Sequence, residues 1–394
     1  MLRVSSRAWI MIRKIIPNLI SIVLIGTTSS GMLAEMHSKQ AAGVSAGDAP
    51  LTLGTKAKHL SANFNRHDVA KAMKLVADWQ IGRLPTVAQT DWTFAALYPG
   101  LLALYNSVGD EKYRRAVFGI SQELHWQPGP QVLNADDQAI GQTYLELYFI
   151  DHDPQMITAI RARMDATMAT PDDPAKPLWW WCDALFMEPP VLADLSFATG
   201  DSKYLAYMDH EWMITSNLLY DREKHLYTRD ATFLDKRENN GQKIFWARGN
   251  GWVIAGLARV LDSIPAESPL RAKYALMLQQ MASALAALQG TDGLWKPGLL
   301  DARQYPLSEV SGSAFITYAL AYGINHGILD RKIYTPAVHA AWRGLLTHIY
   351  ADGRLGSIQP IGAVPGDFTE TSSYVYGVGA YLLAGSEIYR SLNH

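Results

Sequence analysis

The sequence predicts an all-α fold, an (α/α)6 barrel made of six helical hairpins, and three observations lead to this prediction. From about Leu60 onward, apolar residues recur at three- and four-residue spacing in nearly every segment. No segment shows the sustained alternation of apolar and polar residues that marks a half-buried sheet. A weak internal repeat indicates helix pairs of about 55 residues, and the length beyond residue 60 accommodates six of them.

The apolar spacing predicts helices in order along the chain. Clusters of Gly, Pro, Asn and Asp separate several of them, as at 128–130, 171–174 and 290–293. The expected helices cover residues 69–79, 94–107, 113–124, 139–150, 184–198, 203–220, 251–264, 271–289, 314–326, 336–349 and 375–392.

The internal repeat is built on a Gly-Asp-x-Lys-Tyr core. It reads VGDEKYRRA at 108–116 and ATGDSKYLAYM at 198–208, with a looser copy, LDRKIYTPA, at 329–337. In each full copy one helix ends, Gly turns the chain, Asp caps the next helix and Tyr faces inward. Repeated helix pairs close into a ring or stack as an open solenoid; neither end shows the polar capping repeat that a solenoid requires.

The composition excludes several classes of function. Charge is nearly balanced, with 35 basic and 37 acidic residues and no block of one sign, which argues against a nucleic-acid groove or a polybasic membrane patch. The single cysteine, Cys182, excludes an intramolecular disulfide and a cysteine-based zinc site. The histidines form no H-E-x-x-H pattern, so no metal or other cofactor is expected. The 12 Trp and 19 Tyr suit stacking on sugar rings, although most should be core residues.

Residues 1–35 are expected to be a signal peptide or an N-terminal anchor. A basic front precedes a short apolar stretch at 15–25, small residues follow, and Ala34 is a cleavage position. The apolar stretch is shorter than the roughly 20 residues of a membrane span. We therefore expect an exported, periplasmic and monomeric protein, with a linker at 36–58 and a catalytic barrel at 59–394.

The densest candidate site is KPLWWWCDALFMEPPVLADL at 176–195. Trp179, Trp180 and Trp181 cannot all point into one core, and they come just before Asp183, where a helix begins. An aspartate there is ordinarily an N-cap. A carboxyl held against aromatic walls loses hydration, which raises its pKa and suits a general acid, so we favour a catalytic Asp183.

The second candidate segment is IFWARGNGWVIAGLARVL at 244–261. Trp246, Arg248 and Trp252 surround a Gly-Asn-Gly turn that permits close ligand approach. Arg248 between two tryptophans suits a planar carboxylate or a pair of ring hydroxyls, or else it neutralises a neighbouring aspartate.

The third candidate segment is LNADDQAIGQTYLELY at 133–148. Asp136 and Asp137 are either a cap with a solvated neighbour or a partner to Asp183, as a base or as a charge that shifts its pKa. Glu309 and Glu370 precede two later helices, and we expect them to act as caps.

Taken together, these segments resemble glycoside hydrolase family 105, the unsaturated rhamnogalacturonyl hydrolases, whose cousins are the unsaturated glucuronyl hydrolases of family 88. The shared motifs span 92–387 in the family's order. They read WWWCDALFM, FWARGNGW, DDQAIGQTYLELY, SGSAFITYALAYG and YGVGAYLLAGSE.

The resemblance implies an (α/α)6 barrel that acts on lyase-generated oligosaccharides ending in a 4,5-unsaturated uronic acid. It implies that Asp183 protonates the vinyl-ether double bond at carbon 4 and then, as a base, helps water add at carbon 5. It places the family's second aspartate at Asp136 or Asp137, with Asp136 aligning better. The pocket-lining positions that it implies are Trp181, Met187, Trp246, Arg248 and Trp252.

One segment departs from the family pattern. Many members carry a histidine in a short H-G-W stretch, where this chain reads LYTRDATFLD at 226–235. Arg229 and Asp230 stand in that stretch as candidate substrate-binding residues, and we therefore expect the sugar in the leaving-group subsite to differ from the rhamnose of pectin fragments.

Two other functions use the same toroid. A sugar epimerase needs two pocket histidines as acid and base. His125 and His225 lie near candidate loops but outside the tryptophan-rich motifs, which counts against this reading. A non-catalytic glycan-binding protein would keep the tryptophans and would have no use for a desolvated Asp183.

Overall fold

The computed structural model describes residues 46–171, 173 and 177–392. They belong to a compact unit that extends from Ser45 to His394. The expected signal peptide or anchor at 1–35, and the first part of the expected linker, lie outside the described residues. Within the described parts, no helix combines the length and apolar character needed to cross a membrane.

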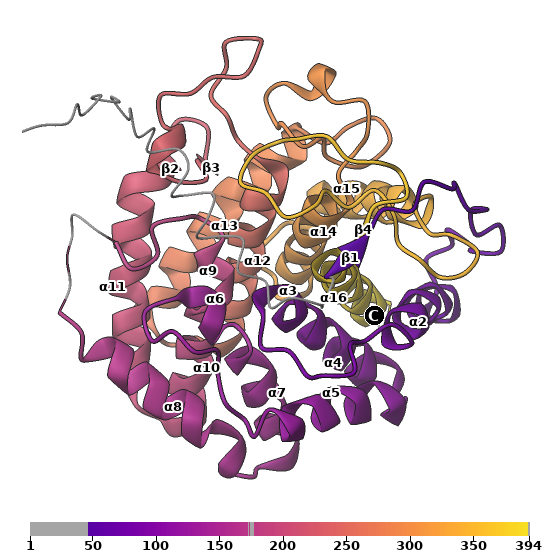
Figure 1. Cartoon of the computed structure of the whole chain (residues 1–394). Helices are drawn as coiled ribbons and strands as arrows, with labels where there is room; N and C mark the ends of the chain where they lie inside the picture. The colour runs from indigo at the N-terminus through magenta and orange to yellow at the C-terminus, as the bar shows by residue number, and fades with distance from the viewer. Residues whose placement is uncertain (1–45, 172, 174–176, 393–394) are drawn as a thin grey trace, which may run out of the picture. The chain divides into compact units, whose positions relative to one another are not determined.

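The helices alternate along the chain between an outer and an inner layer, which together form a closed ring (Figure 1). The outer helices are α2 (Arg66–Ile81), α5 (Glu111–Glu123), α8 (Gln155–Met168), α11 (Ser202–Leu219), α13 (Pro269–Ala287) and α15 (Arg331–Leu346). The inner helices are α4 (Leu97–Val108), α7 (Gly141–Asp151), α10 (Pro189–Thr199), α12 (Ala247–Ser263), α14 (Val310–Asn325) and α16 (Val375–Ser391). The last helix, α16, packs against α4 and α2 and closes the ring. The prediction of an (α/α)6 barrel is confirmed.

The inner helices are buried on nearly every side, most completely α12, α14 and α16. Such helices approach closely only where side chains are absent. A Cβ added at Gly379 of α16 would overlap the carbonyl oxygen of Ala96, and one at Gly312 of α14 would overlap the backbone at Ala247. Glycine lowers the helix propensity at these positions, but it allows the inner helices to pack closely against each other.

The repeat forms the corner between an inner helix and the next outer helix, as expected. Gly109 and Gly200 end α4 and α10 in the left-handed conformation, at φ of 70° and 71°. Asp110 and Asp201 then cap α5 and α11 through the backbone N–H of the second following residue. The tyrosine of each copy is fully buried.

The structure adds elements that the apolar pattern did not mark. Helix α8 and the short helix α6 (Ala135–Gln138) were missed. The predicted helices at 94–107 and 184–198 are each divided, so that short helices α3 (Trp92–Ala95) and α9 (Ala184–Met187) precede the inner helices α4 and α10. Short antiparallel pairs join β1 (Gly47–Asp48) to β4 (Ser373–Tyr374) and β2 (Tyr220–Asp221) to β3 (Leu226–Tyr227).

Part of the expected linker is attached to the barrel. Besides the β1–β4 pair, Lys56 forms an antiparallel bridge with Tyr350, and the N–H of Ala57 donates to the carbonyl of Ile349. The segment 46–58 differs from a free linker because its backbone groups pair with the loops around 350 and 373.

Candidate active site

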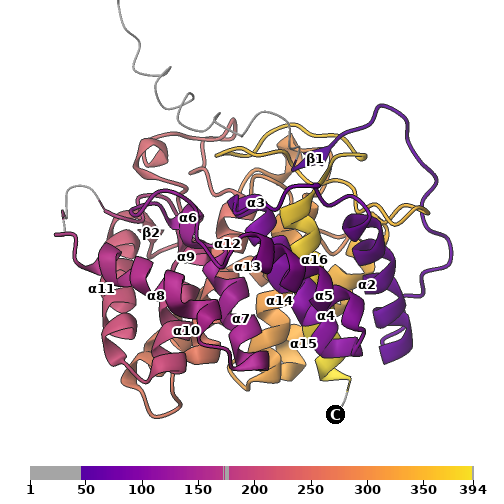
Figure 2. The same ribbon diagram turned by 60° about the horizontal axis from the view of Figure 1, so that its bottom comes forward.

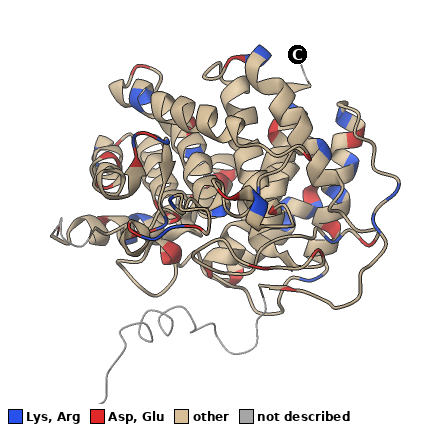
Figure 3. Ribbon diagram, turned by 90° about the horizontal axis from the view of Figure 1, so that it is seen from above, with Lys and Arg blue, Asp and Glu red and all other residues tan. Residues whose placement is uncertain are grey.

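The candidate site residues predicted from the sequence lie where the inner helices begin. Asp183 precedes α9 and α10, Asp136 lies in α6 ahead of α7, and Arg248 is in the first turn of α12. In Figure 2 these ends lie toward the long loops and β1, on the side away from the C-terminus. Figure 3 shows acidic and basic positions interspersed on a mostly uncharged ribbon, in keeping with the balanced charge.

Asp183 is not a helix cap. It stands at the start of α9, yet its side chain makes no capping hydrogen bond, and the residue is only 8% exposed. Its Oδ2 lies 3.4 Å from the Sγ of Cys182, which donates to it, and 3.7 Å from the Nε of Arg229. Burial raises the pKa of Asp183, while the positive charges of Arg229 and Arg248 act in the opposite direction.

Arg229 and Asp230, from the segment that departs from the family pattern, lie directly against Asp183. The carbonyl of Arg229 accepts from the N–H of Cys182, and Asp230 forms a backbone bridge with Trp181. Arg229 is 8% exposed and donates from Nη1 to Asp230 at 2.7 Å. Its guanidinium is thus held between two carboxyl groups.

The three tryptophans diverge, as expected. Trp179 and Trp181 are buried, whereas Trp180 is 37% exposed and its ring lies 5.2 Å from the Arg229 guanidinium. The Nε1 of Trp179 donates to Glu188 at 3.0 Å, which anchors the segment to the start of α10. Trp180 therefore offers an open aromatic face beside Asp183 and Arg229.

Asp136 and Asp137 face different surroundings. Burial and the negative charges of Asp183 and Asp91 raise the pKa of Asp136 to about 8. Asp137 instead turns toward the 128–131 turn, where its Oδ2 accepts from the N–H of Gln131. The charge of Asp183 thus acts on Asp136, while Asp137 holds a loop; a catalytic role for Asp136 stays a prediction.

Four of the residues expected to line the pocket are almost completely buried among other side chains of the barrel. Met187 and Trp252 are at most 1% exposed, and Trp252 packs against four other aromatic rings. Arg248 is 1% exposed and donates to the carbonyls of Gln359 and Pro360 at 2.6 and 2.8 Å. Trp246 lies under the Arg248 guanidinium. Direct sugar contact by these residues stays a prediction, and so does contact by Trp181.

Gln359 was not expected, and it fixes the loop that runs from α15 to α16. Its Oε1 accepts from the Nε1 of Trp246, and its Nε2 donates to the carbonyl of Val364. Its N–H donates to Glu309, and its carbonyl accepts from Arg248 and from the hydroxyl of Tyr376. No helical or strand pattern in the sequence marks this residue.

The two glutamates behave differently. Glu309 caps α14 by accepting from the N–H groups of Ser311 and Gly312, as expected. Glu370 is exposed, and α16 begins only at Val375 without a side-chain cap, so the capping prediction for Glu370 is wrong. The alternative catalytic histidines lie elsewhere: His125 is exposed just after α5, and the ring of His225 bonds to Tyr220.

This arrangement is suited to proton transfer. Burial raises the pKa of both Asp183 and Asp136, and the negative charge of Asp183 raises that of Asp136 further, as suits carboxyl groups that donate protons. The adjacent guanidinium favours charge on Asp183, so one carboxyl can act first as an acid and then as a base.

Comparison with known proteins finds close relatives. The sequence model of Glycosyl Hydrolase Family 88 matches residues 65–392. An "Unsaturated 3S-rhamnoglycuronyl hydrolase" from Formosa agariphila is 39% identical over 344 residues, which cover 82% of this chain and 91% of the relative. A protein of the same name from an Alteromonas species is 31% identical over 344 residues, covering 79% of this chain and 83% of the relative.

A solved structure shares the fold at comparable identity. The "Glycosyl hydrolase family 88 from Bacteroides vulgatus" superposes with a TM-score of 0.79 and 32% identity, over 83% of this chain and 99% of that one. The likeness therefore extends over nearly the whole barrel.

Proposed function

This chain belongs to glycosyl hydrolase family 88 and is a glycoside hydrolase, and we propose that it removes a 4,5-unsaturated uronic acid from the non-reducing end of lyase-generated oligosaccharides. The observation that carries the proposal is the buried carboxyl group of Asp183, which lies 3.7 Å from the Nε of Arg229 and whose charge acts on the half-buried Asp136. An unsaturated uronate is a vinyl ether, and its cleavage begins with a proton rather than with a nucleophile.

In the proposed reaction Asp183 transfers a proton to carbon 4 of the double bond. Positive charge develops at carbon 5 and on the ring oxygen, and the Asp183 carboxylate, now ionised, favours it. Water then adds at carbon 5 and returns a proton to Asp183. The hemiketal opens to a ketone, and the hemiacetal left at carbon 1 breaks down and releases the neighbouring sugar.

In the resting enzyme, Asp136 holds a proton that it can pass to Asp183. Its pKa of about 8 keeps it mainly protonated at neutral pH, which limits repulsion when Asp183 is ionised. Arg229 stabilises the ionised form of Asp183 after each transfer. Neither role requires the anomeric carbon to react directly.

We propose a rhamnose in the leaving-group subsite. Support comes from the names of two relatives, both unsaturated 3S-rhamnoglycuronyl hydrolases. This proposal departs from our expectation, drawn from Arg229 and Asp230, of a sugar other than the rhamnose of pectin fragments. We further propose export to the periplasm, on the strength of the N-terminal pattern. Because one chain supplies the whole candidate site, we propose that the monomer is active.

The test is loss of the ultraviolet absorbance of the conjugated uronate in lyase digests of ulvan, pectin and glycosaminoglycans. We expect the fastest loss with fragments in which the unsaturated uronate is linked to rhamnose, because the relatives' names specify that sugar. Persistence of the chromophore in every digest would refute the proposed function and favour a glycan-binding protein.

A further inference from the structure

A second polar pocket lies at the barrel end that holds the candidate active site. It has a volume of about 400 Å³ and is enclosed by β1, the C-terminal end of α2 and the strand leading into α16. The size lies within the range of small-molecule sites and exceeds what one or two waters need. None of its lining residues belongs to the acid–base cluster.

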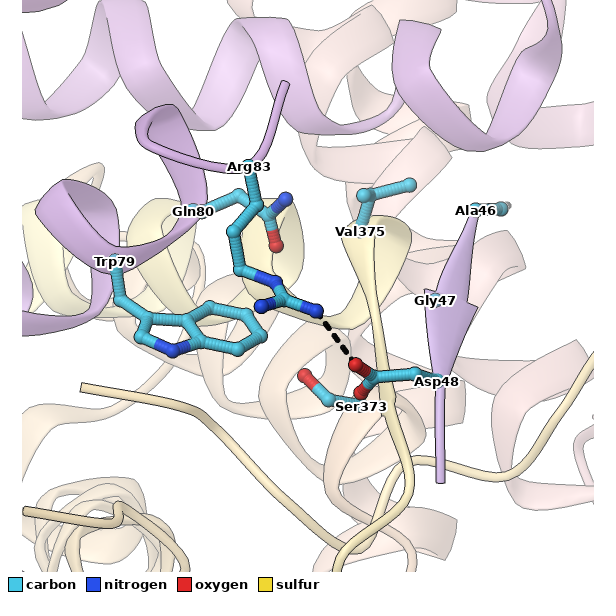
Figure 4. Close-up of a pocket in the computed structure, with 8 residues that line it drawn as sticks. All are labelled: Ala46, Gly47, Asp48, Trp79, Gln80, Arg83, Ser373 and Val375. Atoms are coloured by element: carbon cyan, nitrogen blue, oxygen red, sulfur yellow. Dashed lines mark hydrogen bonds and ion pairs between the residues drawn. The ribbon is translucent and has the colours of Figure 1, made fainter. Parts of the chain in front are cut away.

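The walls of this pocket combine a cation with an aromatic ring. The Arg83 guanidinium lies 4.6 Å from the ring centre of Trp79 and donates from Nη2 to Asp48 at 2.6 Å (Figure 4). The Arg83 side chain is 50% exposed. A guanidinium has five N–H donors, so further donors stay available for an anionic group.

Two buried oxygens in the pocket have no hydrogen-bond partner. They are the Oγ of Ser373, a residue only 2% exposed, and the Oδ1 of Asp48. Figure 4 shows the Ser373 hydroxyl near the Asp48–Arg83 pair, with the amide of Gln80 also directed toward the pocket. Both oxygens are closed to solvent, so the charged groups that face a ligand are the half-exposed side chains of Arg83 and Asp48.

Aromatic rings connect this pocket with the acid–base cluster. Tyr374, between two lining residues, stacks on Tyr376 at 5.6 Å, and Tyr376 stacks on Trp92 at 5.4 Å. The Arg248 guanidinium lies 5.0 Å from the Tyr376 ring. The charges of both Asp48 and Arg248 act on the Tyr374 hydroxyl. The rings of Trp92 and Tyr374 are partly exposed, so an oligosaccharide that extends from Asp183 toward this pocket could stack on them.

We propose that this pocket is a distal subsite for an anionic sugar, sulfated or uronic, located beyond the leaving-group residue of a longer substrate. The inference rests on the proposed function. Arg83 would bind the anionic group, while the half-exposed carboxylate of Asp48 would accept from a ring hydroxyl. The enzyme therefore favours tetrasaccharides over disaccharides.

The test compares KM for the unsaturated disaccharide and tetrasaccharide purified from one lyase digest. Arg83→Met should raise KM for the tetrasaccharide about tenfold, the loss of one charge-assisted contact, and leave KM for the disaccharide within twofold. Arg222→Met, at an exposed arginine outside the pocket, is the matched control.

Equal KM effects on the two substrates, or none, would overturn the subsite and leave the proposed function standing. Failure of the wild-type protein to consume the disaccharide would instead refute the proposed function. Calorimetric titration of the tetrasaccharide into Asp183→Asn, with and without Arg83→Met, provides the same comparison without turnover. Unchanged affinity there would also overturn the subsite.

Discussion

The carboxyl groups of Asp136 and Asp137 are adjacent in the chain and differ in role. Asp136→Asn fixes the uncharged form, so the component of the alkaline decline in activity that is centred near 8 should disappear, while the component due to Asp183 should remain. We expect kcat to fall about 100-fold, in the range for loss of one acid–base group. Asp137→Asn still accepts from Gln131, and its kcat should change less than about threefold. The pH dependence of kcat for both variants checks the assignment, and a larger loss in Asp137→Asn would reverse it.

Arg229 favours the charged form of Asp183 and thereby lowers its pKa. Removing that charge in Arg229→Met should raise the pKa, so Asp183 should keep the proton that it donates up to a higher pH, and the alkaline limb of the kcat/KM profile should move to higher pH. Arg229→Lys keeps the positive charge and should shift this limb much less. An alkaline limb that is unmoved in Arg229→Met would show that the guanidinium does not act on Asp183.

Some of the site residues could be predicted from the sequence and others could not, and the reason lies in the local structure around each of them. Three consecutive tryptophans pointed to Asp183, because they could not all be buried, and Trp180 is the one left open. Which of Asp136 and Asp137 faces Asp183 depends on how the 128–131 turn folds back on α6, and no spacing in the sequence records that. The buried positions of Arg248 and Trp252 were likewise not readable from their motif.

At the scale of elements, the loop between α15 and α16 is held by Gln359. Gln359→Ala would leave the buried Nε1 of Trp246 without its acceptor and would free the carbonyl of Val364. The expected loss of unfolding free energy is about 1–3 kcal/mol. Chemical denaturation measures it, and limited proteolysis within 359–366 should become faster. An unchanged denaturation midpoint with unchanged cleavage would show that the loop is held by other contacts.

Helices with strong three- and four-residue periodicity were predictable, and the loops were not. Helices α12, α14 and α16 follow long apolar segments, so their sites could be anticipated. Gln359 bonds to Trp246, which is 113 residues away, and no local pattern encodes such a contact. For the same reason β1 was expected within a linker, since its partner β4 lies near the other end of the chain.

At the scale of the whole molecule, buried carboxyl groups make stability depend on pH. Burial raises the pKa of Glu188 and Asp194 to about 7 and that of Asp136 to about 8. The folded state binds these protons more tightly than the unfolded state does, so stability is lost as pH rises from about 4 to about 8.

Glu188→Gln tests that dependence at one position. The amide oxygen can still accept from Trp179, while the group no longer ionises. Its melting temperature should match the wild type near pH 5 and exceed it by a few degrees at pH 8. Scanning calorimetry at the two pH values measures the difference, and a variant that is less stable than wild type at pH 8 would contradict the assignment.

The most direct test of the account is the rate at which Asp183→Asn removes the uronate chromophore from the unsaturated disaccharide. Because Asp183 is proposed both to give and to take the proton, kcat should fall at least about 1,000-fold, equivalent to about 4 kcal/mol of barrier. Asp137→Asn, with its carboxyl turned toward the loop, should stay close to wild type. A folded Asp183→Asn protein that consumes the chromophore within tenfold of the wild-type rate would contradict the mechanism.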